Sequence, residues 1–308
     1  MRIIFIGTPE FAVAPLKALL ASQHEVIAVV TQPDRQSGRG RKVHACPVKE
    51  AALTAGINVL QPGKVREREF INELRSFDPD AIVVVAYGQI LPSEIINLPE
   101  CGCINIHASL LPRYRGASPI NRAIIDGESK TGITTMLMDE GMDTGPVLLQ
   151  EEIEIRPDDT AGSLSDRLSK VGSDLILKTL EGLEKENVTP VPQSGESSYA
   201  PMMKKTDGNI DWTKSASELS NFIRGMNPWP GAYTFLEGGR IKILGVNILD
   251  EGGEAGTVER VSKDELIIGA GKGSLSVLEI QPPGKKAMAV SAFLQGKKMK
   301  KGMKLNSQ

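Results

Sequence analysis

The sequence has few of the features that mark secreted or membrane proteins. It contains only three cysteines, Cys46, Cys101 and Cys103, and this odd, sparse set argues against a disulfide framework and favours a reducing compartment. No apolar run approaches the ~20 residues that a membrane-spanning helix needs. The opening residues, MRIIFIGTPE, are typical of a buried strand and not of a signal peptide. We therefore expect a cytoplasmic protein.

A strong excess of one charge is also missing. The formal net charge is -2, so the overall field does not indicate nucleic acid, although a neutral total can hide a local basic face. The spacing of Cys101, Cys103 and His107 matches no standard zinc pattern and lacks a fourth ligand, so we predict no metal site. The loop GTPEF after the first expected strand lacks the full G-x-G-x-x-G, which disfavours a nicotinamide dinucleotide site.

The first half of the chain alternates apolar runs with helical patterns. Unbroken Val/Ile runs such as 81–88 suit strands that are buried on both faces, as in a parallel sheet covered by helices. The expected fold class is therefore α/β, with a doubly wound, mostly parallel sheet. Strands are expected at 2–7, 25–32, 57–62, 81–88, 103–109, 132–140 and 146–155, and helices at 10–22, 47–56, 65–77 and 160–186.

The second half has a different texture. Residues 187–209 are rich in Pro, Ser and Gly without a clear period, which is typical of a linker. Short apolar segments broken by glycines follow over 231–284 and predict a small β-barrel. We expect a catalytic domain over 1–189, a linker over 190–208 and a β-barrel domain over 209–308. The tail 284–308 carries seven lysines and no acidic residue.

Two polar side chains end one of the expected strands. Asn105 and His107 are two residues apart, so they share a face, at the sheet edge where doubly wound domains bind ligands. An amide and an imidazole aimed at one point suit acyl transfer, because both can stabilise a developing oxyanion and the ring can also exchange a proton. Asp143, in a glycine-rich turn, is the best carboxylate to orient the ring, and Asp139 is the competing candidate that can instead cap the turn. Any one of these residues alone is more often structural, so the prediction depends on their combination.

The combined motifs resemble those of the folate-dependent formyltransferase family. NIHASLLPRYRGASPI (105–120) and MDEGMDTGPVL (138–148) match the Asn, the His, the Ser-Leu-Leu-Pro loop and the later Asp of that family. The similarity extends along the chain through RIIFIGTPEFA, TQPDRQSGRGRK, KKTDGNIDW and NPWPGAY. The resemblance implies a Rossmann-like formyltransferase domain followed by an OB-like β-barrel that binds tRNA.

The resemblance also implies substrates and residue roles. The donor would be 10-formyltetrahydrofolate, and the acceptor would be the amino group of methionyl initiator tRNA. We expect the protein to bind this tRNA as a monomer. Asn105 and His107 would hold the oxyanion, and Asp143 would pair with His107. The folate site would be formed by Ser109, Leu110, Leu111, Pro112, Gln89, Ile90 and Leu91. The tRNA would meet a basic loop over 31–50, which could also be merely solvated, through Arg39, Arg41 and Lys42.

Four alternatives share part of this pattern. An amino-sugar formyltransferase would need neither the basic loop nor the lysine-rich tail, and a purine-pathway formyltransferase would not need a second domain of about 100 residues. A formyltetrahydrofolate hydrolase would pass the formyl group to water and would have no use for a basic RNA face. A non-enzymatic RNA-binding protein would not need Asn105, His107 and Asp143 together.

Overall fold

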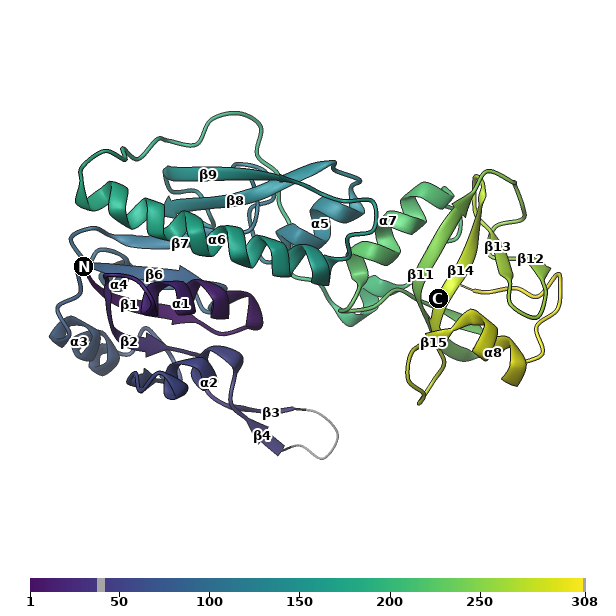
Figure 1. The fold of residues 1–308 in the computed structure, drawn as a ribbon, viewed down its shortest axis with the longest axis horizontal. Coiled ribbons are helices and arrows are strands. Elements are labelled where there is room, and N and C mark those ends of the chain that lie inside the picture. The colour runs from purple at the N-terminus through teal and green to yellow at the C-terminus, as the bar shows by residue number, and fades with distance from the viewer. Residues whose placement is uncertain (38–41, 307–308) are drawn as a thin grey trace. The chain divides into compact units, whose positions relative to one another are not determined.

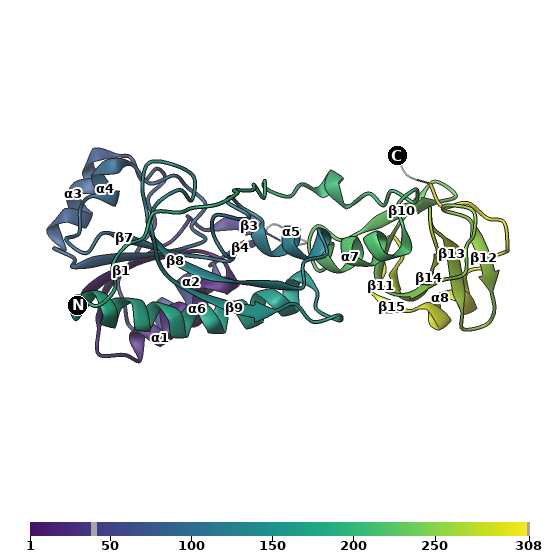
Figure 2. The same cartoon turned by 90° about the horizontal axis from the view of Figure 1, so that it is seen from above.

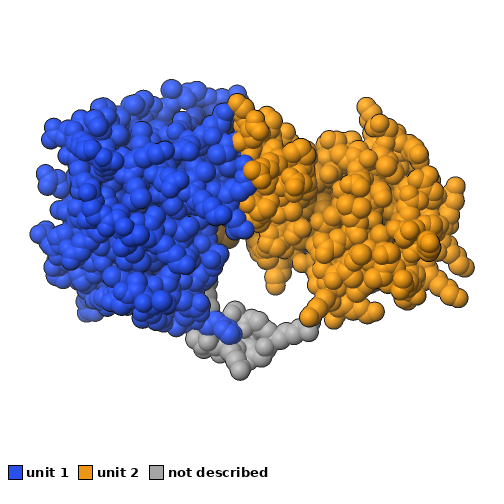
Figure 3. Space-filling view, viewed as in Figure 1, with its two compact units in different colours: residues 1–119, 131–153, 165–200 blue, residues 120–130, 154–164, 201–308 orange. Residues whose placement is uncertain are grey.

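The computed structural model describes residues 1–37 and 42–306 of the chain. These residues divide into two compact units, which Figure 3 colours blue and orange. Unit 1 comprises residues 1–119, 131–153 and 165–200, and unit 2 comprises residues 120–130, 154–164 and 201–308. Residues 120–130 and 154–164 thus pack with the part of the chain that follows residue 200. The expected domain limits of 1–189, 190–208 and 209–308 stay a prediction.

Unit 1 is built on a seven-stranded sheet with the order β5-β2-β1-β6-β7-β8-β9. The pairs from β5 to β7 are parallel, and β8 runs antiparallel to β7. This arrangement confirms the predicted doubly wound, mostly parallel sheet. The strands are β1 (Arg2–Gly7), β2 (Glu25–Val30), β5 (Val59–Leu60), β6 (Ala81–Val85), β7 (Cys103–His107), β8 (Lys130–Leu137) and β9 (Val147–Glu154).

Helices cover both faces of this sheet. Figure 2 shows α3 and α4 on one side of it and α1 and α6 on the other. The apolar runs of β1 and β6 are fully buried because both of their faces are covered. The helices up to residue 184 are α1 (Val13–Leu20), α2 (Pro47–Thr54), α3 (Arg68–Ser76), α4 (Ser93–Ile96), α5 (Pro119–Ile125) and α6 (Ala161–Glu184), and a 3-10 turn, Glu10–Ala12, precedes α1. Of these, α5 falls in unit 2 from residue 120 onward.

The alternation of β7 decides which of its side chains reach the site. Cys103 packs with Leu91 and Ile96 in the apolar cluster on the α3 and α4 side of the sheet. Ile106 points the other way, beside Gly172 of α6. Since Asn105 and His107 share the face of Cys103, they emerge on the α3 and α4 side at the carboxyl end of the strand.

The basic loop expected over 31–50 contains a short antiparallel ribbon. β3 (Arg35–Ser37) pairs with β4 (Lys42–His44), with Arg35 opposite His44. No signal for this ribbon is visible in the sequence, because backbone hydrogen bonds hold it and hydropathy does not report them.

Unit 2 contains an antiparallel sheet with the order β10-β11-β14-β13-β12, and β15 pairs with β14. Residues 302–306 connect the two edge strands of this sheet. Asn306 exchanges backbone hydrogen bonds with Phe235 of β10. Val258 of β12 donates its N–H to the carbonyl of Met303 and accepts the N–H of Gly302. The sheet therefore curls, which agrees with the predicted small barrel. The elements are η2 (Lys205–Gly208), α7 (Ala216–Met226), β10 (Tyr233–Leu236), β11 (Gly239–Leu249), β12 (Val258–Val261), β13 (Leu266–Gly269), β14 (Ser274–Gln281), β15 (Met288–Ala289) and α8 (Val290–Gly296) (Figure 1).

Candidate active site

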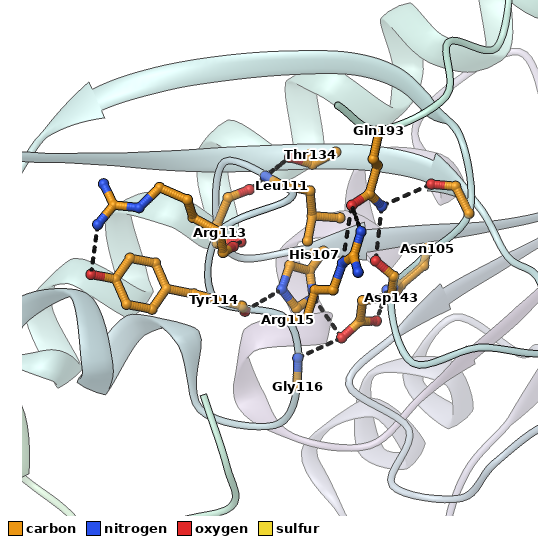
Figure 4. Close-up of polar contacts among 12 residues, drawn as sticks. Asn105, His107, Leu111, Arg113, Tyr114, Arg115, Gly116, Thr134, Asp143 and Gln193 are labelled. Atoms are coloured by element: carbon orange, nitrogen blue, oxygen red, sulfur yellow. Dashed lines mark hydrogen bonds and ion pairs between the residues drawn. The ribbon is translucent and has the colours of Figure 1, made fainter. Parts of the chain in front are cut away.

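The Asp143 carboxylate is the point at which the predicted catalytic side chains meet (Figure 4). Its Oδ2 lies 3.6 Å from Nδ1 of His107, and its Oδ1 lies 3.4 Å from Nδ2 of Asn105. The backbone N–H of Gly116 donates to Oδ2 at 2.7 Å. The side chains of Asn105 and His107 are largely buried, and that of Asp143 is 18% exposed. The structure thus brings together three residues that lie up to 38 positions apart in the sequence.

The imidazole of His107 lies between two oxygen acceptors. Nε2 lies 3.0 Å from the carbonyl oxygen of Tyr114, and since a carbonyl can only accept, Nε2 carries the proton of this bond. Nδ1 faces Asp143, and this second contact is an ion pair when the ring is protonated. Tyr114 has a φ of 59°, so the loop after β7 bends sharply to bring its carbonyl under the ring. The ring is therefore fixed in orientation from both sides.

The loop that carries Asp143 is shaped by its own polar groups. Asp139 accepts hydrogen bonds from the backbone N–H of Gly141 and from Oγ1 of Thr144, so it caps the turn and leaves Asp143 to face the imidazole. Asp143 has a φ of 54°, in the left-handed region. At Gly145 a Cβ would lie 1.9 Å from the carbonyl oxygen of Leu137, so the close return of the loop to the end of β8 requires glycine.

A cavity of about 370 Å³ opens beside Asp143. Its apolar wall includes Leu91, which is buried, and Ile90, which is 75% exposed. Gln89 also lines it and accepts a hydrogen bond from the backbone N–H of Val65. Three carboxylates and no cation are among the described lining residues, so the cavity is acidic. The full lining is Gln89, Ile90, Leu91, Ile96, Met136, Met138, Asp139, Glu140, Gly141, Met142 and Asp143.

The Ser-Leu-Leu-Pro loop has structural contacts of its own. Ser109 is fully buried, and its hydroxyl donates to the carbonyl of Arg113 at 2.6 Å. Leu110 packs over Gly132 of β8, and Leu111 is held by hydrogen bonds of its backbone to Thr134 and Gln150. These residues shape the loop from within, and they are not among the described residues that line the cavity. The folate roles predicted for Ser109, Leu110, Leu111 and Pro112 stay predictions.

The predicted tRNA-binding residues fall mostly outside the described part of the chain. Arg39 and Arg41 lie between residues 37 and 42, and the side chain of Lys42 is likewise outside the description. Their roles therefore stay predictions from the sequence.

Sequence reasoning missed one residue that touches the Asp143 loop. Gln193 lies in the stretch predicted as a linker, yet its side chain hydrogen-bonds the carbonyl oxygens of Asp143 and Gly145 and the guanidinium of Arg115 (Figure 4). No periodic pattern surrounds it, because residues 192–198 form neither helix nor strand. The only signal in the sequence is a glutamine directly after the VTPVP run of residues 188–192.

Both halves of the chain match known protein families. Residues 1–180 match the family model described as formyl transferase, and residues 202–298 match that described as formyl transferase, C-terminal domain. The chain therefore belongs to the formyl transferase family.

Proteins of known name are similar to this chain over almost its whole length. A methionyl-tRNA formyltransferase of Thermodesulfovibrio yellowstonii is 50% identical over 301 residues, which cover 98% of this chain and 97% of the relative. A methionyl-tRNA formyltransferase of Desulfotalea psychrophila is 51% identical over 302 residues, which cover 97% of this chain and 94% of the relative.

Solved structures share the fold at lower identity. The sugar 3N-formyl transferase WlaRD, solved in the presence of dTdp and 5-N-Formyl-THF, has a TM-score of 0.68 at 21% identity, covering 93% of this chain and 99% of the other. A methionyl-tRNA formyltransferase from Clostridium thermocellum has a TM-score of 0.57 at 18% identity, and the match covers 80% of this chain and 93% of the other.

Residues 1–37 and 42–306 contain no group of three or more His, Cys, Asp or Glu side chains placed to hold a metal ion. None of the helices in these ranges has the length and apolarity that a membrane crossing needs.

Proposed function

We propose that this protein transfers the formyl group of 10-formyltetrahydrofolate to the free amino group of methionyl initiator tRNA, giving N-formylmethionyl-tRNA. The observation that carries the proposal is the convergence of Asn105, His107 and Asp143 beside a cavity. Membership of the formyl transferase family defines the group transferred. The acceptor follows from relatives that are about half identical over almost the whole chain. The protein acts in the cytoplasm as a monomer.

The first half of the reaction is attack of the amine on the formyl carbon. A C–N bond forms, and the formyl oxygen becomes an oxyanion. An N–H of the Asn105 amide stabilises this charge, and the His107 ring does so when its Nε2–H exchanges the Tyr114 carbonyl for the oxyanion. Each such donor is worth roughly a 10²–10³-fold increase in rate. The Asn105 bond to Asp143 is long, at 3.4 Å, so little is lost when the amide turns to the substrate.

The second half moves two protons and breaks one bond. The new ammonium loses its proton to Asp143, directly or through one water molecule, and the carboxylate faces His107 at 3.6 Å. The bond between the formyl carbon and N10 then breaks, and N10 takes a proton to leave as tetrahydrofolate. The protons balance, because the amine gives up one and N10 receives one.

The cavity fits the donor. A pterin is a flat polar heterocycle, which needs an apolar slot with polar groups at its edge. Ile90 and Leu91 offer the apolar wall, and Gln89 and the carboxylates of the 139–143 loop offer the polar edge. Carboxylates accept hydrogen bonds from amino groups, which the pterin edge carries.

The acceptor meets basic residues outside this cavity. Arg39, Arg41 and Lys42 bind phosphates of the acceptor stem, and the lysine-rich tail adds affinity without sequence recognition.

The proposal is tested with purified protein, 10-formyltetrahydrofolate and charged tRNA. We expect N-formylmethionine after deacylation of methionyl initiator tRNA and much less from methionyl elongator tRNA. Formylation of a nucleotide-linked amino sugar instead, or release of formate without any acceptor, would refute the proposed acceptor. No consumption of the formyl donor with any acceptor would refute the enzymatic function.

A further inference from the structure

The last part of unit 1, residues 191–200, runs back along both loops of the site, and we call it the return segment. Val191 exchanges two backbone hydrogen bonds of 2.8 Å with Val147, which follows the Asp143 loop. Ser198 and Ala200 bond the backbone of Arg115, in the loop after β7, at 2.8 and 2.7 Å. A stretch predicted as a linker thus borders both segments that hold the Asp143 carboxylate.

The side chain of Gln193 is the link between these two segments. Its Nε2 donates to the carbonyl oxygens of Asp143 and Gly145, each at 2.8 Å. Its Oε1 accepts from Nε and Nη2 of Arg115 at 3.1 and 2.6 Å. An amide has two donor hydrogens and an oxygen with two lone pairs, so all of its capacity is used.

Arg115 fixes which way the Gln193 amide faces. A guanidinium only donates, so it requires the amide oxygen on its side and leaves the NH₂ group for the two carbonyls. The Asp143 loop is then held at two points: Gly116 holds the carboxylate from one side, and Gln193 holds the backbone from the other. Asp143 needs this support, since its φ of 54° is unfavourable for a residue other than glycine.

From these contacts we infer that Gln193 is a positioning residue, which sets the placement of the Asp143 carboxylate against His107. The inference rests on the proposed function, because it concerns the same reaction. Gln193 acts through the backbone of Asp143 and needs no contact with either substrate. Without its two hydrogen bonds the loop can shift, and a displacement of about 1 Å at a reacting group can cost about 10²-fold in rate.

The test compares Gln193→Met with the wild type at saturating substrates. Methionine keeps the length of the side chain and removes every hydrogen bond. We expect kcat to fall about 10–100-fold, while the KM values for donor and tRNA stay within about twofold. Gln193→Glu is expected to behave similarly, because its carboxylate accepts from Arg115 but offers the two carbonyls no donor. Gln23→Met, an exposed glutamine of unit 1, is the matched control and is expected to keep the wild-type kcat.

A double-mutant cycle with Asp143 separates positioning from a general structural effect. In an Asp143→Asn background the Gln193→Met change is expected to lower kcat by less than about twofold, because the carboxylate it places is already gone. The same loss in both backgrounds would overturn the inference, as would a folded Gln193→Met variant with wild-type kcat. If Gln193→Met does not fold, Arg115→Lys replaces it: the lysine keeps the charge but loses the two-pronged contact with Oε1, and an unchanged kcat would again overturn the inference.

The wild type, assayed in parallel, separates the two proposals. An inactive wild type would refute the proposed function, whereas an active wild type with an equally active Gln193→Met variant would refute only the role of Gln193.

Discussion

Replacing Asp143 by asparagine removes a charge with almost no change in shape, so it tests the carboxylate itself. The carboxylate accepts a hydrogen bond from the Gly116 N–H, lies 3.4 Å from the Asn105 amide nitrogen and faces Nδ1 of His107 at 3.6 Å. An asparagine oxygen can keep the short bond to Gly116, but its NH₂ group must then face the amide of Asn105. Because that contact is already long, we expect a cost in folding of only about 0.5–1.5 kcal/mol.

The loss in catalysis is expected to be larger. In the proposed reaction Asp143 takes the proton of the attacking amine, and a positioned acid–base group of this kind contributes about 10²–10⁴-fold in rate. Asparagine cannot accept that proton, so we expect the barrier to rise by about 3–4 kcal/mol. Since 1.36 kcal/mol corresponds to a factor of ten, kcat should fall about 10²–10³-fold.

The assay is single-turnover formyl transfer with saturating donor, run beside a urea unfolding curve. Asp139→Asn is the matched control: this carboxylate lies in the same loop but caps the turn, so we expect a loss at least about ten times smaller. A folded Asp143→Asn variant that keeps more than about a tenth of wild-type kcat would refute the role of the charge.

Three further predictions concern other parts of unit 1. Gly145→Ala should lower the free energy of unfolding by about 1–3 kcal/mol, because the added Cβ meets a backbone oxygen. Gly63 has open space around it, so Gly63→Ala should change the free energy of unfolding by less than about 0.5 kcal/mol. Equal urea midpoints for the two variants would contradict this prediction. Burial lowers the pKa of His24 below its unfolded value of about 6.5, so the unfolded chain binds more protons than the folded chain at low pH. The free energy of unfolding should therefore fall as the pH drops below about 6.5. In unfolding titrations at about pH 7.5 and 5.5, the His24→Gln variant should show a smaller fall. Burial raises the pKa of the Cys103 thiol to about 12, so a thiol reagent should label the other two cysteines of the native protein and reach Cys103 only after unfolding; fast labelling of all three would contradict the packing of β7.

Much of the fold was predictable because it depends on local patterns. Buried runs such as 81–85 and the long amphipathic helix Ala161–Glu184 are visible in the order of apolar residues alone. The pairing of Asn105 with His107 was predictable for the same reason, since a strand repeats every two residues. Motif similarity then assigned these residues to formyl transfer, and the family match bears out that activity.

Contacts between distant segments could not be predicted in this way. The family resemblance implied that Asp143, 38 residues from Asn105, pairs with His107. Local patterns alone left Asp139 as a competitor, because the choice depends on the turn that Asp139 caps. The hydroxyl of Ser109 turns to the carbonyl of Arg113 and so into its own loop, which no spacing in the motif indicates.

The sequence by itself determined the strands, the helices and the set of polar groups available at the end of β7, because each depends on residues close together in the chain. Only the tertiary structure decided that Gln193, from a stretch without periodicity, holds the backbone of Asp143. The physical reason is that a hydrogen bond between segments 50 residues apart depends on where both backbones are placed, and neither segment carries a local pattern that records the other.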